Sequence, residues 1–371
     1  MRKDTALLVN FENLSYNFQE LNKLAPHNEV LFMIKANAYG SGLTETYRYA
    51  KEVNRISNFG VASLGEAIKI RETYPKDKTS IYVFSDLNLD NHEFIKLYDE
   101  LDIIPVISDM ESLKIYIEKL KSRPLVIKLN TGMNRLGFAK SEVDELISIV
   151  AKNNLNIFHL MTHFSSSYFD VDRVQATRKQ YELFCDIKKS FLSSGVSIQN
   201  TSCANSGAIE QEFSLNENFI RPGLMLYGPY SVGGIKNEPI KWHGKNINSL
   251  ETRIIKKTFF KKGTPIGYGG TVVDDDYQVL LLPIGYGDGF LTYYANAKFK
   301  LESQEVKVLG RVNMDMVALG VKGSSTGFKL NQKVKIWDFD QASLMQFSRS
   351  VKTIPYQVMC AISTRVPRIY L

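Results

Sequence analysis

Short apolar runs alternate with longer amphipathic stretches over residues 10–238, as strands alternate with helices in an α/β fold. In the stretches 64–74 and 141–153, for example, apolar residues recur every three or four positions. The apolar runs that predict strands are 30–36, 58–63, 79–84, 102–107, 124–130, 157–164, 198–204 and 219–227. These strand–helix repeats favour parallel strands in a closed (β/α)8 barrel. An open doubly wound sheet is the alternative, but no glycine-rich dinucleotide fingerprint follows the first run.

The pattern changes in the last third of the chain. Residues 239–371 contain short strand-like runs separated by turns, and helical periodicity returns only at 343–351. Such a pattern is typical of a mostly β domain. The glycine-rich segment 227–239 has the composition of a linker. We therefore expect a TIM-like barrel at 10–238 and a mostly β domain at 239–371.

The composition is that of an ordinary soluble protein. Of 371 residues, 44% are hydrophobic and 23% charged, and the lysines behind the net charge of +7 mostly lie beside acids. No basic stripe alternates with aromatic residues, so nucleic acid is not an expected partner. The three cysteines are too far apart for a disulfide framework, and the cysteines and histidines lack metal-ligand spacing. No signal peptide or membrane span is predicted, so we expect a cytoplasmic protein.

Charged side chains follow the C-terminal ends of several predicted strands. Lys35 ends the first run, Lys128 lies in the fifth, His163 ends the sixth and Arg221 lies in the eighth. In a barrel these ends meet at one rim, where catalytic groups lie. Cations and hydroxyls without a carboxylate pair suit an anionic, phosphorylated ligand. By itself Lys35 favours a structural lysine at a sheet edge, but on this rim it suggests a Schiff base with pyridoxal phosphate.

A series of short motifs occurs in a fixed order between about Lys35 and Tyr370. The motifs are MIKANAYGSG, TGMNRLG, THF, ANSGA, RPGLMLYG, PIGYGG, PIGYGDG, GRVNMDM and PYQVMCAISTRVPRIY. In this order they resemble the alanine racemase family. The resemblance implies a pyridoxal 5'-phosphate enzyme with an N-terminal (β/α)8 barrel that binds the cofactor. It also implies a C-terminal β domain and a head-to-tail homodimer whose active sites are shared between subunits.

The resemblance implies a role for individual residues. Lys35 carries the cofactor as an aldimine and is one of two bases, and Tyr268 of the partner subunit is the other. Arg221 faces the pyridine nitrogen and, because arginine keeps its proton, favours reprotonation of the substrate. The other implied cofactor contacts are Tyr39, Arg135, His163, Asn205, Ser206, Gly223, Leu224 and Tyr356. The implied substrate contacts are Arg135, Tyr286, Met314 and Asp315. Lys128 matches a lysine that is often carbamylated to orient Arg135.

Some positions depart from the family pattern. They are Ser41, Asn130, Ser202, Asn313 and Gln357. Ser202 stands where a histidine commonly supports the pyridine-facing arginine, so we expect Arg221 to be held less firmly. Asn313 adjoins the implied substrate pocket, which leaves the substrate open.

The predicted function is racemisation of L- and D-alanine, which supplies D-alanine for peptidoglycan. A racemase of serine or of a basic amino acid on the same scaffold is the alternative. One methyl group in a pocket changes binding by only about 1–3 kcal/mol, so the sequence does not separate these substrates. A non-catalytic pyridoxal-phosphate carrier is a further alternative, and the predicted β domain with Tyr268 argues against it.

Overall fold

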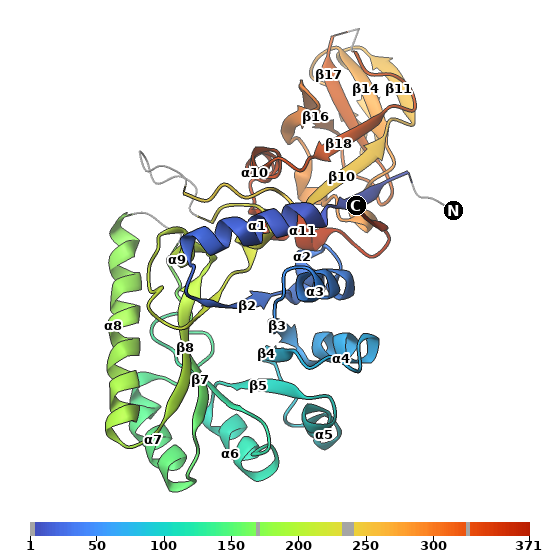
Figure 1. Cartoon of the computed structure of the whole chain (residues 1–371). Coiled ribbons are helices and arrows are strands. Elements are labelled where there is room, and N and C mark those ends of the chain that lie inside the picture. Colours follow the sequence, from blue (N-terminus) through green and yellow to red (C-terminus); the bar gives the residue numbers. More distant parts are fainter. Residues whose placement is uncertain (1–3, 168–170, 232–240, 324–326) are drawn as a thin grey trace.

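A closed barrel of parallel strands forms the N-terminal part of the chain, as the sequence pattern predicts (Figure 1). The computed structural model describes residues 4–167, 171–231, 241–323 and 327–371, so the predicted domain boundary at 238/239 lies outside the described residues. The barrel strands are β2 (Glu29–Met33), β3 (Asn58–Ser63), β4 (Ser80–Asp86), β5 (Ile103–Ile107), β6 (Leu125–Lys128), β7 (Ile157–Met161), β8 (Ile198–Asn205) and β9 (Phe219–Arg221). Pairing of β2 with β9 closes the barrel.

Helices surround the barrel and connect its strands (Figure 1). They are α1 (Phe11–Leu24), α2 (Lys35–Tyr39), α3 (Leu43–Glu52), α4 (Leu64–Thr73), α5 (His92–Glu100), α6 (Met110–Lys119), α7 (Val143–Lys152), α8 (Val171–Ser193) and α9 (Ser206–Glu210). Side-chain caps fix where several of them begin. The side chain of Asn10 accepts hydrogen bonds from two backbone N–H groups of α1, and Asp109 accepts one from α6. The predicted helices at 64–74 and 141–153 correspond to α4 and α7.

The C-terminal unit is mostly β, as predicted. One sheet has the order β18 (Lys333–Trp337), β10 (Asn248–Arg253), β1 (Ala6–Val9) and β19 (Arg368–Tyr370). A second has the order β11 (Lys256–Phe260), β14 (Tyr277–Leu282), β17 (Val317–Lys322), β16 (Gln304–Leu309) and β15 (Lys298–Leu301). The hairpin β12 (Pro265–Ile266) and β13 (Thr271–Val272) and the helices α10 (Gln341–Ser350) and α11 (Pro355–Ala361) complete it. Strand β1 precedes the barrel in the chain, so this unit also includes residues that the sequence pattern left unassigned.

Several predicted strands are too long at their C-terminal ends. Strand β2 ends at Met33, before Lys35, and β9 ends at Arg221, where a 3-10 helix, Leu224–Tyr227, soon follows. The apolar residues beyond these strands are still fully buried, as Ile34 and Leu226 are. Burial therefore continues after the hydrogen-bonded ladder has stopped, and an apolar run alone does not mark the end of a strand.

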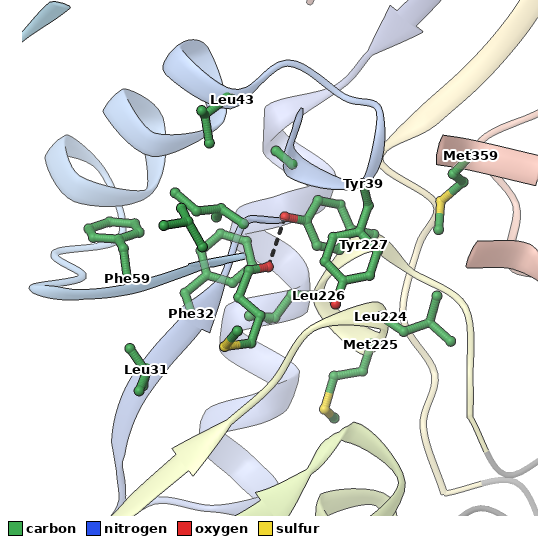
Figure 2. Packing of buried hydrophobic residues seen from close by; sticks show 14 of the residues in the cluster. Leu31, Phe32, Tyr39, Leu43, Phe59, Leu224, Met225, Leu226, Tyr227 and Met359 are labelled. Carbon is green, nitrogen blue, oxygen red and sulfur yellow. Dashed lines mark hydrogen bonds between the residues drawn. The ribbon is translucent and has the colours of Figure 1, made fainter. Parts of the chain in front are cut away.

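Aromatic rings support the chain where β2, α2 and the 3-10 helix Leu224–Tyr227 meet (Figure 2). The ring centroids of Tyr39 and Tyr227 lie 4.4 Å apart, and Tyr227 Oη donates a hydrogen bond to the Met33 carbonyl oxygen at 3.1 Å. The rings of Phe32 and Tyr227 also pack together, with centroids 5.7 Å apart. This packing gives the loops after β2 and β9 a rigid base.

Asn17 connects α1 to the chain between the two units. Its buried amide nitrogen donates hydrogen bonds to the carbonyl oxygens of Leu226 and Lys245, at 2.9 and 2.8 Å, and its oxygen accepts one from Lys245 N at 2.7 Å. We expect Asn17→Ala to lower the free energy of unfolding by roughly 2–4 kcal/mol, because one buried and two partly buried backbone groups lose a partner. Urea unfolding measures this. Asn13→Ala, which removes one bond to the Asn246 carbonyl, is the matched control and should cost roughly 1 kcal/mol; equal losses would contradict the argument.

Candidate active site

A cavity of about 750 Å³ lies at the C-terminal ends of the barrel strands. Its basic lining residues are Lys35, Lys128, Arg135, Arg221 and Arg349, and no described Asp or Glu lines it. A cavity with this excess of positive charge suits a ligand with anionic groups. The rim that the sequence predicted is therefore present and forms one continuous space.

The cavity brings together most of the residues that the sequence singled out. The cavity lining includes Lys35, Tyr39, Lys128, Arg135, His163, Asn205, Ser206, Arg221, Gly223, Leu224 and Tyr356. The remaining candidates, Tyr268, Tyr286, Met314 and Asp315, belong to the C-terminal unit and do not line this cavity. Their side chains are exposed, and that of Tyr268 is 71% accessible. One chain alone therefore holds the cation-rich part of the predicted site.

A left-handed turn positions Lys35. The residues that follow it, Ala36–Tyr39, all have positive φ angles between 50° and 55°. Such a conformation costs roughly 1–2 kcal/mol per residue for an L-amino acid. Glu66 stabilises the turn, because its Oε1 accepts a hydrogen bond from Asn37 N at 3.0 Å, and Asn37 Oδ1 accepts one from Leu43 N at 2.9 Å. Backbone strain held by tertiary contacts is typical of functional sites.

The turn also brings Tyr39 to a small backbone cradle. A Cβ atom at Gly223 would lie 2.4 Å from Tyr39 Oη, so only glycine allows this approach. Ser206 Oγ accepts hydrogen bonds from Gly223 N at 3.0 Å and from Met225 N at 3.4 Å. Asn205, at the N-cap of α9, accepts a hydrogen bond from Ala208 N. Two hydroxyl groups and backbone N–H groups thus converge, as in phosphate-binding sites.

The two lysines of the cavity, half-buried Lys35 and buried Lys128, have lowered pKa values. Burial, followed by the positive charge of Arg135, lowers the pKa of Lys35. The same two causes, with Arg221 and Lys35, lower the pKa of Lys128 to about 8. Both amines are therefore more nucleophilic near neutral pH than an exposed lysine.

Arg221 is buried at the bottom of the cavity. It donates hydrogen bonds to Ser202 Oγ and to the Thr162 and Cys203 carbonyl oxygens. Ser202 Oγ in turn lies 2.8 Å from His159 Nε2. Burial lowers the pKa of Arg221 to about 10, which leaves the guanidinium charged at neutral pH. Ser202 therefore still supports Arg221, as a hydrogen-bond acceptor. That it holds Arg221 less firmly than a histidine would stays a prediction.

Buried histidines make the folded state sensitive to acid. Burial lowers the pKa of His159 from 6.5 to about 3. Between these values the unfolded chain binds one proton more, so this contribution to stability is complete above about pH 6.5 and falls as the pH drops. Between about pH 6.5 and about pH 5.5, this proton uptake should lower the free energy of unfolding of the wild-type chain by about 1 kcal/mol. His159→Leu should abolish this part of the pH dependence. Urea unfolding at both pH values measures it, with Tyr82→Phe as a control in the same core; an unchanged slope in His159→Leu would contradict a buried neutral ring.

Two family models match nearly the whole chain. The model described as alanine racemase, N-terminal domain, matches residues 9–231, and the model described as alanine racemase, C-terminal domain, matches residues 247–370. The chain belongs to the alanine racemase family.

Relatives and solved structures agree with this family. The alanine racemase of Carboxydothermus hydrogenoformans is 29% identical over 371 aligned residues, which cover 98% of each chain. That of Fusobacterium nucleatum is also 29% identical and covers 98% of this chain and 99% of its own. The structure of alanine racemase from Acinetobacter baumannii aligns over 100% of both chains with a TM-score of 0.82 and 27% identity. The crystal structure of alanine racemase from E. faecalis aligns over 100% of this chain and 98% of its own, with a TM-score of 0.83 and 25% identity.

Positions that depart from the alanine racemase pattern have ordinary structural contacts. Ser41 Oγ accepts a hydrogen bond from Asn248 Nδ2 at 3.2 Å, which joins the turn after α2 to the C-terminal unit. Asn130 Oδ1 accepts hydrogen bonds from Gly132 N and Asn134 N and shapes the loop that carries Arg135. Gln357 is hydrogen-bonded to Thr353. Asn313 differs from these, because its Oδ1 is buried and has no hydrogen-bond partner among the described residues.

The exposed candidates of the C-terminal unit lie in turns and loops, except Tyr286, which begins the short 3-10 helix Tyr286–Asp288. Tyr268 is in the turn between β12 and β13. Tyr286 N donates a hydrogen bond to the Asn313 carbonyl oxygen at 2.9 Å, and Asp315 forms an ion pair with Arg365 at 2.5 Å. Other large apolar side chains of this unit are also exposed, namely Val272, Tyr293 and Met316. Exposed apolar side chains in such number favour an interaction surface.

The sequence missed part of the cavity wall. Arg349, on α10, donates a hydrogen bond to Tyr230 Oη at 2.9 Å, and both residues line the cavity with Ser231. The segment 343–351 predicted a helix, but nothing in its pattern placed Arg349 beside the barrel. The contact depends on how the two units pack, which local periodicity does not encode.

None of the helices in the described ranges combines the length and the apolar character that a membrane-spanning segment needs.

Proposed function

We propose that this chain is a pyridoxal-phosphate-dependent racemase of alanine. The observation that carries the proposal is the meeting of Lys35, Arg221 and the cradle of Tyr39, Ser206 and Gly223 in one cation-rich cavity. Relatives named alanine racemase align over almost the whole chain, so the whole length of their fold is present.

The residues of the cavity fit this cofactor. A Cβ at Gly223 would fill the space beside Tyr39 Oη, and the hydroxyl and backbone groups there would bind the phosphate. Lys35 would hold the aldehyde group, since its lowered pKa favours the reactive neutral amine. Arg221 would face the ring nitrogen. When bound, the cofactor supplies an electron sink that makes the Cα proton of an amino acid acidic.

The chain's own residues then have distinct tasks. Lys35 Nζ takes or delivers the Cα proton on one face of the substrate, and Tyr268 Oη of the partner subunit does so on the other. Arg135 binds the substrate carboxylate through a charge-assisted hydrogen bond. Arg221 keeps its own proton and leaves the ring nitrogen unprotonated, which favours return of a proton to Cα over competing reactions. If Lys128 is carbamylated, its negatively charged carbamate would orient Arg135.

A homodimer completes the site in this proposal. Tyr268, Tyr286 and Met314 are exposed in one chain and lie away from its own cavity. Placed over the cavity of a second copy, they would supply the second base and close the substrate pocket from solvent. The exposed apolar side chains around them support such an interface.

Purified protein with added pyridoxal phosphate tests the proposal through interconversion of the D and L forms of alanine, serine, lysine and arginine. Fast turnover of alanine is the expected result. A preference for serine would support the alternative substrate. Turnover of none would overturn the racemase proposal and favour a carrier. The use of D-alanine in peptidoglycan stays a prediction from the resemblance.

A further inference from the structure

Arg221 carries a buried positive charge without a carboxylate. Only 4% of its surface is exposed, and no described Asp or Glu forms an ion pair with it. Its partners are neutral oxygens, namely two backbone carbonyls and the hydroxyl of Ser202. A guanidinium in this setting depends on those oxygens for its orientation as well as for its solvation.

Ser202 and His159 form a second layer behind Arg221. Ser202 lies on β8 and is paired with Met161 of β7, and His159 is two residues earlier on β7. On a strand, residues two apart lie on the same face, so the imidazole reaches the serine from the neighbouring strand. His159 Nε2 lies 2.8 Å from Ser202 Oγ, and both side chains are fully buried.

A histidine at this place is unfavourable unless it has a polar task. Its ring packs against apolar surfaces, with the Phe219 ring centroid 5.0 Å away and that of Tyr82 5.9 Å away. Its Nδ1 has no hydrogen-bond partner among the described residues. A leucine would fill the same space without an unpaired polar atom, so the bond to Ser202 is the one interaction here that requires an imidazole.

We propose that His159 is a positioning residue that acts through Ser202 to fix the guanidinium of Arg221. The serine hydroxyl alone can rotate, and the ring nitrogen restricts it to the orientation in which its oxygen accepts from Arg221 Nη1. The neutral ring adds no charge, so Arg221 stays the only cation of this chain of contacts. This role rests on the proposed function, in which the guanidinium of Arg221 faces the ring nitrogen of the cofactor.

The test compares two probes of the cofactor-free protein. One is pyridoxal phosphate, and the other is its 1-deaza analogue, in which a C–H group replaces the ring nitrogen. Both use the phosphate cradle and the lysine, so the ratio of their dissociation constants reports the contact of Arg221 with the nitrogen. Fluorescence titration of the wild-type chain should show binding of pyridoxal phosphate tighter by roughly tenfold or more.

Two near-isosteric variants and their combination separate the proposal from a general packing role. We expect His159→Leu and Ser202→Ala each to reduce the ratio by roughly threefold to tenfold, with affinity for the deaza analogue unchanged. Because His159 acts through the serine, the double variant should match Ser202→Ala alone. Tyr82→Phe, which touches the same ring but not the serine, is the control and should keep the wild-type ratio.

The outcomes distinguish the two proposals. If the wild-type chain binds neither probe, or both equally, the proposed function or its placement of Arg221 fails. If the wild-type ratio is large and His159→Leu retains it, the positioning role is overturned while the proposed function stands. Equal loss of both probes in His159→Leu would show a packing effect alone, and additive effects in the double variant would refute action through Ser202. Thermal unfolding of each cofactor-free variant confirms that it is folded.

Discussion

Lys35→Ala should lower the rate of racemisation by at least about a thousandfold and abolish covalent attachment of pyridoxal phosphate, because one side chain supplies both the amine and a base. Borohydride reduction of the loaded protein, followed by peptide mass spectrometry, measures the attachment directly. In the wild-type chain we expect the cofactor mass on the peptide that contains Lys35. In the variant we expect it on no peptide.

The cavity contains its own matched control for this assignment. Lys128 lines the same cavity and is buried, and its pKa, lowered to about 8, makes its amine reactive near neutral pH as well. Geometry favours Lys35, because the left-handed turn that begins after it brings Tyr39 to the Gly223 cradle within the same short segment. We therefore expect Lys128→Ala to keep the attachment at Lys35. A reduced cofactor on the Lys128 peptide would refute the choice of Lys35.

The sequence predicted the barrel well because its signals are local. Each strand–helix repeat has its own periodicity, and parallel strands of a barrel present their C-terminal ends on one side. The joint presence of Lys35, Lys128 and Arg221 on one rim follows from those two facts. Their placement could therefore be predicted before any contact was known.

The sequence did not predict features that depend on distant partners. A run of positive φ angles after Lys35 is unfavourable for its residues, and Glu66, on another helix, stabilises it. Strand β1 pairs with β10 and β19, which lie more than 200 residues later in the chain. Similarly, the serine at position 202, where a histidine is common in the family, predicted weaker support of Arg221. Only the register of β7 and β8 shows that His159 lies beside this serine. These contacts arise from topology, which local patterns do not contain.

Tyr268→Phe should lower the rate of racemisation by roughly a hundredfold to ten-thousandfold, because the phenol is the proposed base on the second face of the substrate. The phenyl ring keeps the shape of an exposed side chain, so folding should be unaffected. Deuterium uptake at Cα, measured separately from D- and from L-alanine, reports each face. A normal rate in both directions would rule out Tyr268 as a base.

Heterodimers decide whether Tyr268 acts in the cavity of its own chain or in that of the partner. If one subunit carries Lys35→Ala and the other Tyr268→Phe, a shared arrangement leaves one site with both bases intact and the other with neither. Purified through two different affinity tags, this heterodimer should have about half of the wild-type activity, since a C2 dimer has two equivalent sites. Each variant homodimer alone should remain nearly inactive.

The reciprocal heterodimer removes the remaining ambiguity. A wild-type subunit paired with a Lys35→Ala/Tyr268→Phe subunit has the same composition, but a shared arrangement now places one damaged base in each site. This reciprocal heterodimer should therefore be nearly inactive. If each site were instead built within one chain, the reciprocal heterodimer would be half active and the first heterodimer inactive. The two dimers contain the same substitutions and differ only in their distribution between chains. Changes in stability or cofactor affinity affect both alike, so opposite activities follow only from the position of Tyr268 in the dimer.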